Sequence, residues 1–355
     1  MTILEVINVS REVSWLPWAV QYFFLVGLSV ACFFISVPGY VFGQTDAQRF
    51  ARTALVGALA CGFVAPVALL ADLHQPGRFW RFYAHPNLSS WMAWGSFFIP
   101  GYVAGLIVYA WLALRPDLIA ASREGSALAR MYRLIALGEW SASRLIPWIA
   151  GWTAVFALLI LLYTGMEVMV VRARPLWNTP FLPLQFVATS FVGGTGLVLL
   201  LQAVLREGDH RAERTLGRWM LVSLIATVVV GSAWFVIAML GLDRSSTEAL
   251  STLSDHAQWQ LTAVWAAAAI LLPIVILCLK PVGLGWLVGL FGLHAAWMFR
   301  WTVFISGQTV PKTGAGLYVY HLPLGHDGLL GIAGTAGLWL FVAIVLTSLL
   351  PAPAK

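Results

Sequence analysis

Nine long apolar runs separated by short polar connections constrain this chain more than any other feature. A run of about 20 apolar residues is long enough for one helix to cross the hydrocarbon core of a bilayer. Only 10% of the 355 residues are charged and 60% are hydrophobic, whereas about 25% of a soluble domain is charged. Since a bilayer offers the backbone no water, the chain must form helices or a closed barrel, and continuous apolar runs favour helices over alternating strands. The sequence therefore predicts an all-α integral membrane protein.

We expect about nine transmembrane helices in a single domain that covers residues 1–355. The expected spans are 18–43, 50–72, 91–114, 146–170, 181–205, 218–241, 257–279, 283–306 and 328–350. Two shorter helices are expected between them. Leu128, Met131 and Ile135 favour an amphipathic helix in the basic connection after the third span, where a solvated loop is the alternative. The segment from Ser245 to Glu248 resembles a capping box that opens a helix.

The orientation of the spans follows from the distribution of basic residues. Of the 21 lysine and arginine residues, thirteen fall on one side of a serpentine chain and eight on the other. Because the richer side of a membrane protein faces the cytoplasm, we expect the C-terminus inside and the N-terminus outside. The high pI of about 9.5 is then explained by loops that orient the chain, and nucleic acid is not an expected partner.

The remaining polar residues collect on the outer side. Asp72 and His74 follow the second run, Glu167 ends the fourth, and the stretch 321–327 follows the eighth. Loops after even-numbered spans share one face of the membrane. This sidedness predicts an interfacial site for a lipid-soluble substrate.

Tyr163 and Glu167 are the strongest pair. They stand i, i+4 on one face of the fourth span, within the membrane and close to its rim. A carboxylate there is costly, so intramembrane ionisable residues are candidates for function. The alternative is that Glu167 pairs with Arg172 or Arg174 and only fixes the helix end.

Asp72 and His74 form a second pair. A carboxylate beside an imidazole accepts protons near neutral pH, although both residues are also ordinary at a helix C-terminus. Gln21 and Tyr22 at the start of the first span could hydrogen-bond a head group or simply belong to the interfacial aromatic belt.

Arg300 lies inside the outer end of the eighth span. A buried arginine usually has a partner, so we expect it to pair with Asp72 or Glu167 or to extend outward to the interface. Buried Glu167 and Arg300 also leave open a transporter or ion channel, in which they would mark an ion path. The loop 308–327 could cap a site, contact a partner or be a plain connection.

The sequence supports no cofactor or metal of the chain's own. Only His294 is in the middle of a span, so a haem held by two histidines has no second ligand. Cys32, Cys61 and Cys278 occur singly, which disfavours disulfides and an iron–sulfur cluster.

Several segments carry a resemblance that covers essentially the whole chain. They are 14–24 (SWLPWAVQYFF), 71–75 (ADLHQ), 172–175 (RARP) and the Pro-Leu-Trp-Asn that continues it, 300–302 (RWT) and 308–312 (QTVPK). In these the chain resembles the polysulphide reductase membrane subunit (NrfD/PsrC) family, and within it the subfamily that serves tetrathionate reductases. One difference is that polysulphide reductase subunits have a histidine in the first span where this chain has Tyr22, preceded by Gln21.

The resemblance implies a helix bundle that anchors a molybdopterin and iron–sulfur respiratory reductase in the bacterial inner membrane, with a periplasmic N-terminus and a cytoplasmic C-terminus. The chain would oxidise a membrane quinol, menaquinol rather than ubiquinol by expectation, and pass two electrons to a ferredoxin-like subunit on the periplasmic face. A molybdopterin subunit would then carry out the terminal reduction. Another sulfur-compound reductase, such as polysulphide reductase, is the alternative complex, and a passive anchor without a quinone site is also open.

The expected site residues divide by role. Tyr163, with Gln21 or Tyr22, would bind the quinol oxygens, while Asp72, His74 or Glu167 would accept protons. Arg174 and Trp177 would shape the rim of the site or the partner contact. Arg300 would be structural or lie on a proton path.

Overall fold

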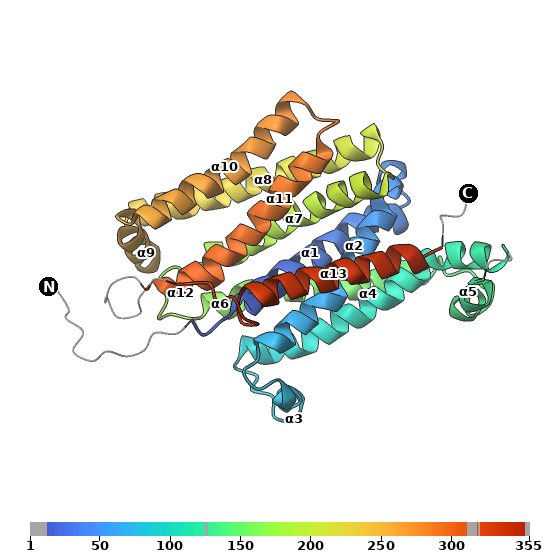
Figure 1. Ribbon diagram of the computed structural model, residues 1–355, viewed down its shortest axis with the longest axis horizontal. Helices are drawn as coiled ribbons and strands as arrows, with labels where there is room; N and C mark the ends of the chain where they lie inside the picture. Colours follow the sequence, from blue (N-terminus) through green and yellow to red (C-terminus); the bar gives the residue numbers. More distant parts are fainter. Residues whose placement is uncertain (1–12, 125–126, 311–317, 319, 352–355) are drawn as a thin grey trace.

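The computed structural model describes residues 13–124, 127–310, 318 and 320–351, and every regular element in these ranges is helical (Figure 1). Nine helices within the described ranges are long and apolar enough to cross a membrane, which confirms the predicted fold class. They are α1 (Pro17–Tyr40), α2 (Thr45–Asp72), α4 (Trp91–Ser122), α6 (Ile146–Met169), α7 (Phe181–Leu205), α8 (His210–Met239), α10 (Ala257–Leu279), α11 with its continuation (Gly285–Thr309) and α13 (Leu329–Leu349).

Shorter elements decorate the ends of these spans. They are η1 (Pro76–Arg78), α3 (Arg81–Ala84), α5 (Ala129–Ala136) and α9 (Arg244–Ser254). The continuation of α11 (Gly285–Trp301) comprises a π-helical segment η2 (Thr302–Ser306) and the short α12 (Gly307–Thr309). Residues 311–317 and 319 of the loop predicted as a possible cap lie outside the described residues.

The spans lie where the sequence predicts them, with differences at polar ends. Helix α4 continues to Ser122 instead of ending at 114, because Arg115 finds partners inside the protein. Its guanidinium donates to the carbonyl oxygens of Ala136, Gly138 and Trp140, and it lies 4.0 Å from the centroid of the Trp140 ring. A charge that ends an apolar run therefore need not end the helix.

Both short helices predicted outside the spans are present, with different details. Tyr132 of α5 is buried against α4, whereas Leu128 and Ile135 of the predicted stripe are 36% and 42% exposed. The capping box predicted at Ser245 was wrong. Helix α9 is capped by Asp243, whose carboxylate accepts from the Ser246 amide at 2.9 Å, since aspartate is among the strongest N-cap residues.

Helix α1 lies at the core of the bundle and contacts α2, α6, α7, α11 and α13 (Figure 1). Close helix packing depends on small residues, as is common in membranes. Helices α7 and α11 meet at Gly196 and Gly289, where a Cβ added to Gly196 would lie 2.8 Å from the Gly289 carbonyl oxygen.

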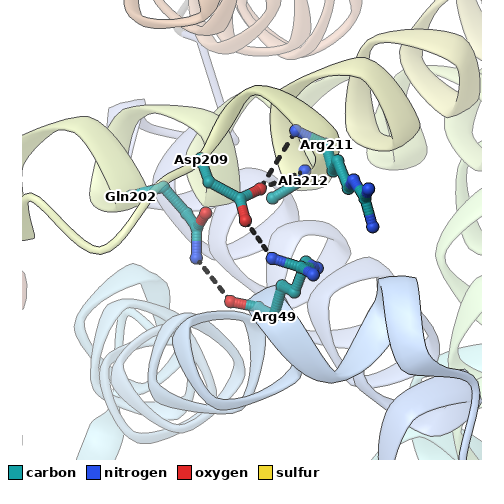
Figure 2. Close-up of polar contacts among 5 residues, drawn as sticks. All are labelled: Arg49, Gln202, Asp209, Arg211 and Ala212. Carbon is teal, nitrogen blue, oxygen red and sulfur yellow. Dashed lines mark hydrogen bonds and ion pairs between the residues drawn. The ribbon is translucent and has the colours of Figure 1, made fainter.

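The alternating spans give the bundle two polar ends. We call the end at which the chain enters α1 the N-side and the opposite end the C-side. The C-side cluster consists of Arg49, Arg52, Thr53, Asp117, Gln202, Glu207 and Asp209. Asp209 of this cluster is the N-cap of α8 and pairs with Arg49, while the Gln202 amide donates to the Arg49 carbonyl at 3.1 Å (Figure 2).

Candidate functional site

Three buried polar side chains meet between α1 and α6 near the N-side. Tyr22, Tyr163 and Glu167, which we call the N-side cluster, are 0%, 2% and 8% exposed. They are close enough for each to interact electrostatically with the other two. Tyr163 and Glu167 share one face of α6 as predicted from their spacing, and α1 brings Tyr22 to the same place.

Glycine and aromatic packing position this cluster. A Cβ added to Gly95 of α4 would overlap the Tyr163 ring, so the ring fits there only because Gly95 has no side chain. On α1, the Tyr22 ring packs edge-on against Phe23 with centroids 4.8 Å apart. Phe23 in turn packs on Phe304 at 4.3 Å. The two tyrosine rings are therefore held by three helices and the π-helical segment.

Two oxygen atoms of the N-side cluster have no partner with regular hydrogen-bond geometry among the described residues, although Tyr163 lies near both Tyr22 and Glu167. The Tyr22 hydroxyl and Glu167 Oε2 are both buried and unpartnered in the part of the chain that the structure describes. Glu167 pairs with neither Arg172 nor Arg174 there, so the alternative of a helix-end ion pair was wrong. Burying such atoms unpaired costs about 1–3 kcal/mol each. Unpaired buried groups of this kind fit a ligand that supplies both hydroxyl donors and acceptors.

Asp72 connects the cluster to the N-side surface. Its carboxylate is half-buried and accepts from the Leu16 amide at 3.2 Å, which fixes the start of α1. It interacts electrostatically with Glu167 on one side and with exposed His74 on the other. The structure thus places Glu167, Asp72 and His74 in order from the buried cluster to the surface.

Gln21 and Tyr22 do not point to the same place. Adjacent residues of a helix are about 100° apart, and Gln21 faces α11, where its Oε1 accepts from Trp297 Nε1 at 3.2 Å. Of the two first-span candidates, Tyr22 is the one in the N-side cluster.

Arg174 and Trp177 hold backbone oxygens instead of facing the cluster. Arg174 donates to the carbonyls of Gln308 at 2.9 Å and Val310 at 3.3 Å, and burial lowers the pKa of its guanidinium. Trp177 Nε1 donates at 2.7 Å to the carbonyl of Val303 in the π-helical segment. Both side chains anchor the loop after α6 to the end of α11, and a direct quinol contact for them stays a prediction.

Arg300 is almost fully buried, with 1% exposure, between α11 and α7. Within the described ranges it pairs with neither Asp72 nor Glu167, and it does not extend outward, so both expectations for it were wrong. Instead it donates to Thr189 Oγ1 at 2.5 Å, Ser190 Oγ at 2.7 Å and the Phe186 carbonyl at 3.1 Å. Serine and threonine on α7 supply the acceptors because Gly27 of α1 leaves room for them: a Cβ there would lie 2.5 Å from Ser190 Oγ.

Gln308 is an important residue whose role the sequence analysis missed. Its Oε1 accepts from the amides of Ser14 at 2.9 Å and Trp15 at 3.1 Å, and its Nε2 donates to the carbonyls of Trp15 at 2.9 Å and Phe304 at 2.6 Å. This side chain therefore fastens the start of α1 to α12. Its presence in a shared family segment was the available signal, but no local pattern shows a contact across almost 300 residues.

His294 and the described acidic side chains bear on the question of a haem or metal site. His294 stacks on Trp265 with centroids 5.3 Å apart. Among the described residues no three His, Cys, Asp or Glu side chains gather as metal ligands would.

The bundle and its N-side cluster define a polytopic membrane protein with a buried polar site near one membrane surface. The family model described as polysulphide reductase, NrfD, matches residues 5–312, and the chain belongs to this family. It is 32% identical over 351 residues to a tetrathionate reductase subunit of Salmonella typhimurium, covering 98% of this chain and 95% of that one.

Two further relatives are more distant in sequence. The chain is 23% identical to a selenate reductase subunit of Mesobacillus selenatarsenatis, over 84% of this chain and 75% of the relative. It is 25% identical to protein NrfD of Escherichia coli, over 73% of this chain and 82% of the relative. Two of these relatives are thus named as subunits of reductases with different substrates, tetrathionate and selenate.

Proposed function

We propose that this chain is the quinol-oxidising membrane subunit of a respiratory reductase, and that the quinol binds at the N-side cluster. The observation that carries the proposal is the meeting of Tyr22, Tyr163 and Glu167 in a buried place with unpartnered oxygens. A quinol has two hydroxyl groups on an apolar ring, so it offers donors to the carboxylate and an aromatic face to the surrounding rings.

The chemistry requires a base beside the quinol. Oxidation of a quinol to a quinone releases two electrons and two protons, and the O–H groups become strongly acidic as electrons leave. In this proposal the Glu167 carboxylate takes the proton of the first hydroxyl, passes it on toward Asp72, and then takes the proton of the second, while the hydroxyl groups of Tyr22 and Tyr163 hold the quinol oxygens. A positioned general base contributes about 10²–10⁴-fold in rate.

Protons then leave by a short route. Glu167 passes its proton to Asp72, and Asp72 passes it to His74 and N-side water; the increase in exposure from buried Glu167 through half-buried Asp72 to exposed His74 supports this route. The electrons leave on the same side to an iron–sulfur subunit of the ferredoxin type, which feeds a molybdopterin subunit. The relative that serves a tetrathionate reductase supports tetrathionate as the terminal acceptor.

The orientation belongs to the same proposal. The excess of basic residues on the C-side supports a cytoplasmic C-side and a periplasmic N-side in a bacterial inner membrane. Partner subunits would then dock on the periplasmic end, beside the N-side cluster. Menaquinol, the quinol that we expect, is part of the proposal.

The test is oxidation of a quinol analogue by membranes that contain this chain and its partner subunits, with tetrathionate as acceptor. Tyr163→Phe should lower turnover per assembled complex at least tenfold, because the phenol that holds the quinol oxygen is lost. Tyr102→Phe is the matched control, since its hydroxyl is already paired with Ser29 at 2.9 Å in another part of the bundle.

Full activity in Tyr163→Phe would move the quinol site elsewhere. Absence of quinol oxidation by wild-type membranes with any acceptor would reject the redox proposal and favour the transporter.

A further inference from the structure

A large cavity lies on the other side of α7 from the N-side cluster. It has a volume of about 960 Å³ and is bordered by α7, α8, α10 and α11, with α9 at its N-side end. It is partly open to the outside of the bundle, where lining side chains such as Trp265 and Leu271 are about half exposed. Ligand sites commonly measure about 300–1,000 Å³. None of Tyr22, Tyr163 and Glu167 lines it, so it is separate from the proposed quinol site.

The sequence of α10 explains why the space exists. Helix α10 presents Ala263, Ala266, Ala267 and Ala269 to the cavity, and these side chains are too small to reach α7. The lining extends along α8 from Leu224 to Val236, about 18 Å at 1.5 Å per residue. This length is more than half of a hydrocarbon core of about 30 Å, so the cavity suits a long apolar molecule.

The lining indicates which kind of molecule fits. Aromatic side chains are prominent in it: Phe181, Trp234, Phe235, Trp259, Trp265 and Phe299. No Asp, Glu, Lys or Arg side chain lines the cavity in the part of the chain that the structure describes. Aromatic walls favour a flat ring, and the absence of charge disfavours a phosphate head group within the cavity.

Gln185 adds a specific polar requirement. Its Nε2 donates to the Thr227 carbonyl at 3.0 Å, which fixes the orientation of the amide. Its Oε1 is buried and has no partner among the described residues, and the residue lines the cavity, so a small rotation of the amide would bring this oxygen to a ligand there. An unpaired acceptor is satisfied by an O–H or N–H donor, which a quinol carries and a quinone lacks.

We propose that this cavity is a second binding site for an uncharged aromatic lipid with a hydroxyl donor, the chemical class of a quinol. The ring lies near Gln185 and the isoprenoid tail follows α8 and α10. The identity of the lipid rests on the proposed function, whereas its chemical class rests on the lining. Thr189 lines the cavity and accepts from Arg300, so the buried cation lies one hydrogen bond behind the cavity wall.

The experiment is photolabelling of the complete complex in membranes with an azido-quinol analogue, followed by mapping of the labelled peptides. We expect label on α8 or α10 in addition to α1 or α6. Excess quinol should reduce the label at both sites. At the α8–α10 site, excess quinone should reduce the label less than excess quinol does. Ala266→Phe, which fills the cavity from an exposed position, should reduce the α8–α10 label at least fivefold.

Val264→Phe is the matched control, because Val264 is 67% exposed on the same helix and does not line the cavity. It should leave both labels unchanged. Gln185→Leu should weaken the preference for quinol over quinone without abolishing turnover.

Label restricted to α1 and α6 in a complex that oxidises quinol would overturn this inference and leave the proposed function intact. Phospholipid that co-purifies with the complex, and is released by Ala266→Phe and not by Val264→Phe, would also overturn this inference, because the cavity would then hold a phospholipid instead of a quinol. Label on α8–α10 in a complex that oxidises no quinol would instead reject the proposed function and leave the second site standing.

Discussion

The two polar ends of the bundle differ in how completely their side chains are satisfied. On the C-side, Arg52 pairs with Asp117 at 2.6 Å, and Thr53 donates to Glu207 at 3.0 Å while accepting from Gln202 at the same distance. Arg49 and Asp209 complete the C-side cluster (Figure 2). On the N-side, the Tyr22 hydroxyl and Glu167 Oε2 are buried and lack partners within the described ranges.

This difference indicates which polar side chains stabilise the fold and which are available to a substrate. Polar groups that serve stability are paired with each other, because an unpaired buried group costs free energy that the fold must recover elsewhere. A protein keeps a buried group unpaired, despite this cost in stability, where the group interacts with a ligand or substrate. The C-side cluster therefore joins the ends of α2, α4, α7 and α8, whereas the N-side cluster is where we propose that the substrate binds.

The largest effect should come from Glu167→Gln. Loss of the base should lower quinol oxidation about 10²-fold or more, while the thermal midpoint stays within about 2 °C of wild type because no hydrogen bond to Oε2 is lost. Turnover and thermal unfolding of the same purified complex check this. A large fall in the thermal midpoint with normal turnover would contradict this prediction, because Glu167 would then stabilise the fold and take no part in the reaction.

Gln308→Leu tests whether every polar group of the N-side belongs to the site. This substitution removes four hydrogen bonds to the start of α1 and to Phe304, so we expect a loss of about 2 kcal/mol. Turnover should fall only a few-fold, through the altered position of Tyr22. Limited proteolysis near the start of α1 and thermal unfolding measure the loss of stability. A thermal midpoint equal to that of wild type would show that the Gln308 hydrogen bonds contribute nothing to stability.

Asp209→Ala makes the opposite prediction to Glu167→Gln. It removes the N-cap of α8 and the pair with Arg49, and a lost cap costs about 1 kcal/mol. The thermal midpoint should fall while quinol oxidation per assembled complex is unchanged. A fall in specific turnover would mean that the C-side takes part in the reaction.

The smallest expected effect is the pH dependence of Asp209. Hydrogen bonds from the backbone, first from Ala212, and the Arg49 guanidinium hold the pKa of Asp209 below its usual value. Since the folded pKa is depressed, its contribution is complete above the unfolded value of about 3.9 and is lost as the pH falls through the lower folded value.

Asp209→Asn keeps a cap and loses the charge, so it should differ from wild type by a few tenths of a kcal/mol at neutral pH. The difference should vanish below the folded pKa. Thermal unfolding at pH 7 and at a series of lower pH values follows this change, and a difference that grows in acid would contradict the assignment.

The lengths of the apolar runs were sufficient to predict most of the transmembrane helices. The spans 181–205 and 257–279 coincide with α7 and α10, because hydrophobic length alone decides where a transmembrane helix can lie. Ends that carry charge were harder to predict. Arg115 continues α4 because of carbonyl partners in a later loop, and no local pattern contains that information.

The candidate site shows the same division. The i, i+4 spacing placed Tyr163 with Glu167, and the serpentine order of the spans placed Asp72 on their side. Whether Gln21 or Tyr22 joins them depends on the rotation of α1, which is set by packing against α2, α7 and α11. The partners of Arg300 could not be predicted for a related reason: they are hydroxyl and carbonyl groups of α7, and which of these common groups faces an arginine depends on helix packing.

The most direct test is a double-variant measurement of quinol oxidation with Tyr163→Phe, Glu167→Gln and the two combined. Residues that act as a unit on one substrate have strongly non-additive effects. We therefore expect the double variant to turn over within about threefold of the slower single variant. Losses that multiply in the double variant would mean that the two residues act independently, and near wild-type turnover in all three variants would remove the quinol site from the N-side cluster.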